Sequence, residues 1–175
     1  MEIEAPQPTS KGPAERFTGD VWVDAVAQQR PQPHRMAAGI VRFAPGARTA
    51  WHVHALGQTL RVTDGTALVQ ARGGQAVAVH PGETVYTPPG EWHWHGAAES
   101  TFMTHLALSE TVPDEKGPTV TWDRHVTDTE YRAAHDTLLT THSTKSTARA
   151  PDGSAVGAAR STEPVRVPLP RGRSS

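Results

Sequence analysis

Four histidines in two short segments of the sequence have the chemistry and the spacing of metal ligands. His52 and His54 are two residues apart, and so are His93 and His95. Alternate residues of a strand point to the same face, about 6 to 7 Å apart, so each pair of imidazoles can converge on one ion at roughly 2.1 Å per bond. Gln58 follows the first pair after a short turn and offers an amide oxygen from the next strand.

Each pair also has a simpler interpretation, because two histidines on one strand are often exposed or held by ordinary hydrogen bonds. A metal site requires a fold that closes and brings the two segments together. The chain contains no cysteine, so thiolate ligands are excluded. Five other histidines fall in predicted turns, a helix or a tail and are expected to be solvated: His34, His80, His125, His135 and His142.

The elements around the histidine pairs are short apolar or alternating runs separated by turn signals. These signals are Pro45-Gly46, Asp64-Gly65, Gly73-Gly74, Pro81-Gly82 and Pro88-Pro89-Gly90. They separate predicted strands at residues 21–24, 38–43, 49–54, 59–63, 67–71, 76–79, 84–87, 92–97 and 102–108. Many short strands at regular spacing are typical of an all-β sandwich or barrel.

One helix is predicted after the strands, because residues 127–130 have the form of a capping box. Apolar and aromatic positions follow at helical spacing (Tyr131, Ala134, His135 and Leu138), and we expect this face to pack on the outside of the barrel. Residues 1–15 form a loose N-terminal arm and residues 16–139 the barrel domain. Residues 140–175 are poor in large apolar side chains and are expected to be disordered, because apolar burial cannot offset the conformational entropy lost on ordering.

The composition argues against several classes of protein. The chain has 175 residues, which suits one domain, and a net charge of −1. Residues 141–175 carry six basic and two acidic side chains, but the arginines are scattered without interleaved aromatics, so no nucleic-acid binding is expected. No apolar run is long enough to span a bilayer, and no signal segment is recognisable at the N-terminus. We therefore expect a soluble, cytoplasmic protein without membrane contact.

The spacing of glycines, histidines and prolines resembles the motifs of the cupin family. The first motif is matched by Gly46, His52, His54, Gln58 and Gly65, and the second by Gly82, Pro88, Gly90 and His93. Gln58 stands where the family usually has Glu, and Ala97 where it often has Asn. The likeness covers residues 36–108 and implies a single cupin barrel, a double-stranded β-helix or jelly roll. It does not specify a reaction, since this fold hosts many chemistries.

A narrower resemblance is to the small bacterial cupins that act as manganese-dependent, (R)-selective hydroxynitrile lyases. Segments 46–52, 56–60, 93–98 and 103–107 look like theirs, and the likeness spans most of residues 11–132. In that group one divalent ion is bound by the residues that match His52, His54, Gln58 and His93. The resemblance therefore implies a transition-metal cofactor, with manganese the expected ion and iron, zinc, cobalt or nickel as alternatives.

Lyase chemistry would suit such a site, because a metal bound by neutral ligands keeps its full charge and is strongly electrophilic. Cleavage of a cyanohydrin to an aldehyde and hydrogen cyanide also requires a group that handles the hydroxyl proton. His95 and His105 are the candidates for that role, although the strand of His105 could present either face to the interior. Thr49 could donate a hydrogen bond to substrate or be an ordinary strand threonine.

The substrate and the assembly are less closely defined. Residues expected to line the barrel suggest a modest apolar cavity for a small molecule: Ala38, Ile40, Val41 and Leu108. Trp51, Trp92 and Trp94 should point away from the histidines, into the core or a subunit contact, and a homodimer or homotetramer is expected. Two other functions remain open, an iron-dependent dioxygenase and a non-catalytic cupin that binds a small ligand or metal.

Overall fold

The computed structural model describes residues 1, 3–27, 30, 33–113 and 116–146. Within these residues the chain forms thirteen strands and one helix. In chain order they are β1 (Ser10–Lys11), β2 (Phe17–Thr18), β3 (Val21–Ala27), β4 (Met36–Phe43), β5 (Arg48–Thr49), β6 (His52–His54), β7 (Gln58–Gly65), β8 (Ala67–Ala71), β9 (Val77–Val79), β10 (Thr84–Thr87), β11 (His93–Ala97), β12 (Met103–Glu110), β13 (Val120–Trp122) and α1 (Asp128–Ser146).

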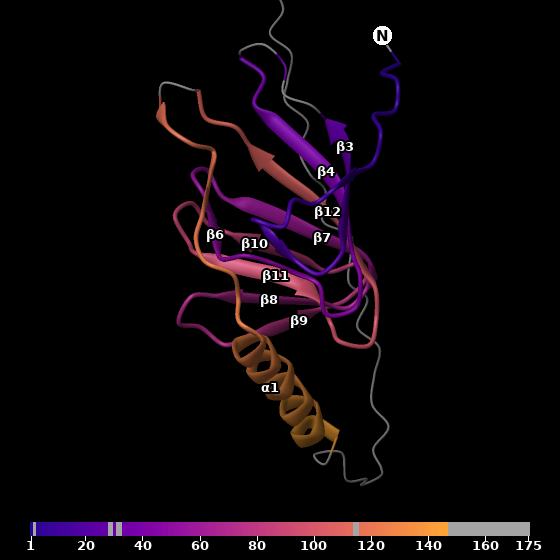
Figure 1. Ribbon diagram of the computed structural model, residues 1–175, viewed down its shortest axis with the longest axis vertical. Coiled ribbons are helices and arrows are strands. Elements are labelled where there is room, and N and C mark those ends of the chain that lie inside the picture. The colour runs from indigo at the N-terminus through magenta and orange to yellow at the C-terminus, as the bar shows by residue number, and fades with distance from the viewer. Residues whose placement is uncertain (2, 28–29, 31–32, 114–115, 147–175) are drawn as a thin grey trace, which may run out of the picture.

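The strands form two sheets that curl around a shared interior (Figure 1). One sheet has the order β1-β3-β4-β12-β7-β10. The other has the order β13-β6-β11-β5-β2, with β8 paired to β11 and β9 paired to β8. All the pairs are antiparallel. This arrangement confirms the predicted all-β barrel with one helix.

The predicted strands are all present, with different ends in most cases. The predicted strand at residues 49–54 is two strands, β5 and β6, separated at Ala50 and Trp51. Three further strands, β1, β2 and β13, are two or three residues long and carry no turn signals that would reveal them. β1 pairs with β3 and lies within the predicted loose arm.

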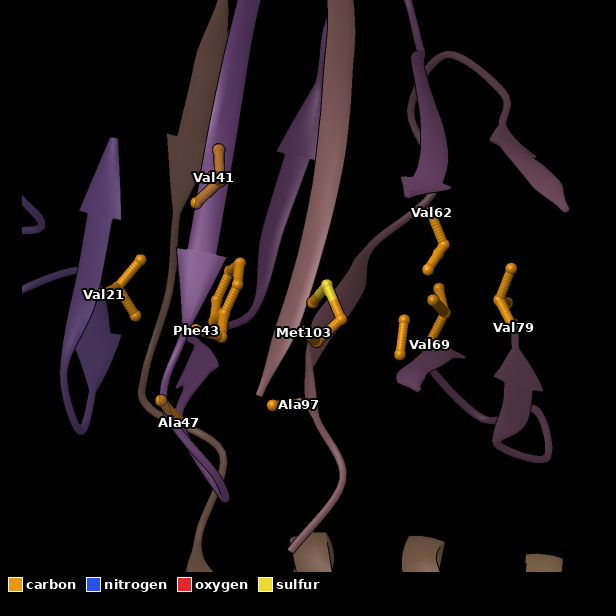
Figure 2. Packing of buried hydrophobic residues seen from close by; sticks show 10 residues of the cluster. Val21, Val41, Phe43, Ala47, Val62, Val69, Val79, Ala97 and Met103 are labelled. Carbon is orange, nitrogen blue, oxygen red and sulfur yellow. The ribbon is translucent and has the colours of Figure 1, made fainter. Parts of the chain in front are cut away.

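The apolar core occupies one end of the barrel, where Phe43 pairs with Met103 (Figure 2). Both side chains have no exposed surface, and Val41, Val62 and Ala97 pack around them. The opposite end of the same sheet is where Gln58 pairs with Ser109. The core therefore closes one end and leaves the other end of the interior to the polar side chains.

A second apolar cluster lies outside the barrel, between the sheet and α1. Trp51, Trp94, Tyr131 and Ala134 are all buried in it, which confirms that the helix packs on the outside and that these two tryptophans belong to the core. The predicted capping box is present, since the hydroxyl of Thr127 accepts from the backbone N–H of residue 130 at 3.2 Å. The helix continues to Ser146, past the predicted boundary at residue 139, and residues 147–175 of the predicted disordered tail lie outside the described residues.

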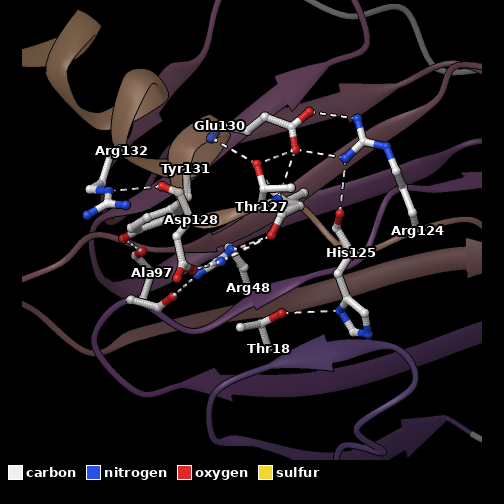
Figure 3. A network of polar contacts seen from close by, with 12 residues as sticks. Thr18, Arg48, Ala97, Arg124, His125, Thr127, Asp128, Glu130, Tyr131 and Arg132 are labelled. Atoms are coloured by element: carbon white, nitrogen blue, oxygen red, sulfur yellow. Dashed lines mark hydrogen bonds and ion pairs between the residues drawn. The ribbon is translucent and has the colours of Figure 1, made fainter.

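A polar network ties the start of the helix to the barrel (Figure 3). The buried guanidinium of Arg48 donates two hydrogen bonds to the carbonyl of Val126, at 3.0 and 3.2 Å, and forms an ion pair with Asp128. The hydroxyl of Tyr131 donates to the carbonyl of Ala97 at 2.7 Å. Arg48 begins β5, which pairs with β11, so these contacts fix the helix against a strand that carries two of the histidines.

Candidate metal centre

The two histidine segments meet across the second sheet. His52 in β6 pairs directly with His93 in β11, and their ring centroids are 4.2 Å apart. Alternation places His54 and His95 on the same faces of these strands, so four imidazoles enter the barrel interior. All four side chains are buried. The fold therefore brings the two histidine segments together, as a shared metal site requires.

Gln58 reaches this cluster from the other sheet because of a tight turn at Gly57. Gly57 has a φ of +82°, a conformation that favours glycine, and a side-chain carbon there would lie 2.8 Å from the carbonyl of Thr87. The turn places Gln58 as the first residue of β7, with 7% of its surface exposed. The amide oxygen Oε1 of Gln58 then lies 3.0 Å from Nε2 of His93.

Backbone carbonyls determine which ring nitrogen each ligand presents to the interior. Nδ1 of His52 lies 3.0 Å from the carbonyl oxygen of Ala50, and Nδ1 of His93 lies 3.0 Å from that of Glu91. A carbonyl oxygen only accepts, so each Nδ1 carries the hydrogen and each Nε2 of a neutral ring offers a lone pair. Orientation of this kind is the usual support for a metal-bound imidazole.

The lone pairs in the interior face one another in a way that suits a cation. With the amide oxygen of Gln58 turned to His93, two acceptors lie 3.0 Å apart and neither atom has a hydrogen to share. Nδ1 of His54 is also buried, with no hydrogen-bond partner in the described part of the chain. A divalent first-row ion satisfies such neutral nitrogen and oxygen donors, so the residues present fit the implied metal.

The arrangement of the imidazoles also brings His95 to the site. Nitrogens of His52, His93 and His95 all lie within 4.8 Å of one another, close enough to hold a metal ion together. His54 lies slightly further out, with its ring centroid 5.4 Å from that of His52 and 5.9 Å from that of His93. The four predicted ligands and His95 therefore share one interior site.

Burial keeps these imidazoles neutral. It is the main cause that lowers the pKa of His52, His93 and His95, and it lowers the pKa of His54 and His105 to about 4. Repulsion from neighbouring imidazoles adds to the effect, mainly from His93 on His52 and from His105 on His95. A neutral imidazole can bind a metal or accept a proton, so both roles are open at neutral pH.

His105 faces the interior, which resolves the orientation that alternation left open. It pairs with Val41 in β4, is 1% exposed, and its Nε2 lies 3.3 Å from Nδ1 of His95. The ring of Phe43 contacts both imidazoles, at centroid distances of 5.8 Å to His95 and 5.5 Å to His105. The two histidines therefore form a buried pair between the metal ligands and the apolar core.

Thr49 contacts this pair through the backbone. Its hydroxyl oxygen accepts a hydrogen bond from the backbone N–H of His95 at 3.1 Å, and its side chain is buried. This contact joins β5 to β11 at the position of His95, so Thr49 holds that strand in place next to the ligands.

Small side chains line the interior at the end where Gln58 lies. Ala107 and Ser109 share the inward face of β12 with His105, and Ala107 pairs with Gly39. Gly39, Ala107 and Ser109 are half-buried rather than buried. The lining is therefore small and less deeply buried at this end, and a surface cleft of about 440 Å³ borders Gln58 there.

The expected apolar lining was partly wrong, because register decides which face of a strand is inward. Val41 points into the core, whereas Ala38, Ile40 and Leu108 alternate with inward residues and lie on the outer face. Trp122, which the sequence did not single out, lies beside the site: it pairs with His52 and stacks on its ring at 4.7 Å. A lone tryptophan in a three-residue strand gives no periodic signal.

The five histidines expected to be solvated lie away from the interior cluster wherever their side chains are described. His34, His80 and His125 are exposed and His135 is half-buried. His125 has a polar contact with Thr18 at 3.2 Å. The side chain of His142 falls outside the described residues.

Comparison with known proteins identifies the family. The cupin domain family matches residues 39–108, the part of the chain that carries all the interior histidines. A protein from Granulicella tundricola named (R)-mandelonitrile lyase is 51% identical over 134 residues, which cover 75% of this chain and 99% of that protein. The chain is a cupin. The resemblance seen in the motif spacing is thereby confirmed.

Solved structures agree with this assignment. A cupin-like protein from Thermotoga maritima has a TM-score of 0.67 and 39% identity, over 77% of this chain and 97% of that one. The polyketide cyclase RemF from Streptomyces resistomycificus has a TM-score of 0.57 over 79% and 98% of the two chains, with 16% identity, which supports the fold only. Within the part of this cupin that the structure describes, no helix combines the length and apolar character needed to cross a membrane.

Proposed function

We propose that this cupin is a metal-dependent carbon–carbon lyase of the hydroxynitrile type, which cleaves a cyanohydrin to an aldehyde and hydrogen cyanide and catalyses the reverse addition. The observation that carries the proposal is a buried donor set of neutral imidazoles and one amide, with no carboxylate among the predicted ligands. The identity to a relative named as a lyase of this type supports it.

His52, His54, Gln58 and His93 would hold the ion, and manganese is the proposed metal. When bound, a divalent ion supplies Lewis acidity, and neutral ligands leave its charge uncompensated. The protein orients the donors through the carbonyls of Ala50 and Glu91. Elemental analysis of the protein as purified tests the identity of the ion.

The pair formed by His95 and His105 would handle the proton. Both imidazoles are neutral at pH 7 because burial lowers their pKa, so either can accept the hydroxyl proton of a cyanohydrin. As the bond between the carbinol carbon and the nitrile carbon breaks, the hydroxyl oxygen becomes the aldehyde oxygen. The resulting imidazolium then returns its proton to cyanide, which leaves as hydrogen cyanide.

The open end of the interior suits an uncharged small substrate. The strands that line it next to Gln58 present the uncharged residues Gly39, Ala107 and Ser109. Arg35 and Glu110, in the adjoining cleft, form an ion pair with each other at 3.3 Å. Phe43 and Val41 limit the depth of this space. An aldehyde or cyanohydrin with an apolar substituent fits that chemistry better than an ionic substrate does.

The activity is tested with racemic mandelonitrile and manganese-loaded protein, with benzaldehyde release followed by its absorbance. We expect benzaldehyde release above the uncatalysed rate with the native protein, and release at the uncatalysed rate with His52→Ala. His80→Ala is the matched control, because this histidine is exposed and lies outside the interior cluster. Equal rates for the native protein and His52→Ala would remove the proposal. Oxygen consumption by the iron-loaded protein would instead favour a dioxygenase.

A further inference from the structure

The aromatic side chain of Trp122 covers one face of the His52 imidazole. The two residues pair directly between β13 and β6, and their rings stack with centroids 4.7 Å apart and planes inclined by 25°. His52 is 1% exposed and packs against His93 on another side, at 4.2 Å. Neither His54 nor His93 has a tryptophan in contact with its ring among the described residues. His52 is therefore held differently from the other imidazoles.

Two routes connect His52 to the same distant residue, Arg16. Through the backbone, the carbonyl of Arg16 accepts from the N–H of Ala50 at 2.8 Å, and the carbonyl of Ala50 contacts Nδ1 of His52 at 3.0 Å. Through side chains, the guanidinium of Arg16 lies 5.4 Å from the centre of the Trp122 ring system, which in turn stacks on His52. Arg16 thus contacts both the backbone that orients His52 and the tryptophan that stacks on it.

The stacking contact restrains the plane of the His52 ring, which the hydrogen bond to Ala50 does not. A hydrogen bond at Nδ1 fixes one point of the imidazole but allows the ring to rock about it, whereas a metal bond at Nε2 needs the lone pair to lie in a defined plane. An aromatic face that lies nearly parallel to the ring limits that rocking. A π face also favours an imidazole made electron-poor by a bound cation.

We propose that Trp122 is a positioning residue that fixes the plane of the His52 imidazole for metal binding. The inference rests on the proposed metal site. It predicts that a flat aromatic side chain is required at position 122, and that apolar volume alone is insufficient. Loss of a group that orients a metal ligand by a hydrogen bond typically weakens metal binding by roughly 10- to 100-fold, and we expect a comparable loss here.

The test compares Trp122→Phe with Trp122→Leu, which both keep an apolar side chain while only the first keeps a flat face. Dissociation constants for Mn²⁺ are measured by competition with a chelator, and the absorption spectrum of the Co²⁺-loaded protein reports ligand geometry. We expect Trp122→Phe to stay within about threefold of the native affinity, and Trp122→Leu to bind about tenfold to a hundredfold more weakly with an altered Co²⁺ spectrum. Trp22→Ala is the matched control, since Trp22 is also half-buried but lies on the other sheet.

Equal affinities and equal spectra for the Phe and Leu variants would overturn the inference. His52→Ala separates this result from failure of the metal site itself. If His52→Ala loses the ion and the two Trp122 variants do not differ, the proposed metal site is supported and the positioning role of Trp122 is rejected. If His52→Ala retains the ion, the metal site falls and the inference falls with it.

Discussion

The two faces of strand β11 can be compared directly, since both are buried and their chemistry is opposite. His93 and His95 face the barrel interior, with imidazoles whose pKa burial lowers. Trp94 faces α1, has no exposed surface, and donates from its indole nitrogen to Gln70 at 2.9 Å. One face places groups that can bind a metal or a proton, and the other supplies apolar burial that holds the strand in position. Binding and stability are thus divided between alternate residues of one strand.

The largest expected effect is on the interior face. His93→Ala should weaken Mn²⁺ binding by more than about a hundredfold, because loss of even an outer partner costs roughly 10- to 100-fold. The free energy of unfolding of the metal-free protein should change less than it does in Trp94→Ala. Chelator competition and urea denaturation in excess chelator measure the two quantities. A variant that keeps native affinity for Mn²⁺ would contradict the division.

The second effect is on the outer face. Trp94→Ala should lower the free energy of unfolding by about 3–5 kcal/mol, since it removes a fully buried aromatic side chain from the cluster under α1. The affinity of the folded fraction for Mn²⁺ should remain near the native value. Urea denaturation and chelator competition at low temperature check this pair of outcomes. A change in affinity as large as that of His93→Ala would show that the two faces are not separable.

The smallest effect near neutral pH is a pH dependence that belongs to the interior face. Burial lowers the pKa of His105 from 6.5 to about 4, so between these values the unfolded chain binds a proton that the folded chain does not. The contribution of His105 to the free energy of unfolding should therefore be fully present above pH 6.5. It should fall by about 1.4 kcal/mol per pH unit as the pH drops toward 4. Denaturation curves across this range, with chelator present, measure the slope. His105→Gln should reduce it, and an unchanged slope would contradict the assignment.

Much of the fold and the site could be predicted because they depend on the alternation of residues along a strand and on the spacing of motifs. His52, His54, His93 and His95 share a face in any extended strand, and the glycine and proline spacing restricts how the strands connect. The capping box at Thr127 predicted the helix start for a similar reason, since its two hydrogen bonds are local.

The remainder depends on register between strands, which no local pattern fixes. His105 could have faced either way until its pairing with Val41 was known, and the same pairing put Leu108 on the outer face. β13 is three residues long, so the contact of Trp122 with His52 joins positions 70 residues apart without a signal in either segment. The closeness of His95 to the metal ligands likewise follows from the geometry of the closed sheet.

The packing of β13 beside His52 affects when the site can form during synthesis. The predicted ligands all lie before residue 94, and so leave the ribosome ahead of β13. The neighbouring strand, and the backbone bond from the N–H of Asp123 to the carbonyl of Trp51 at 2.8 Å, come about thirty residues later. A nascent chain therefore carries its ligands about thirty residues before it has the strand that borders them, and the aromatic face beside His52 is added last.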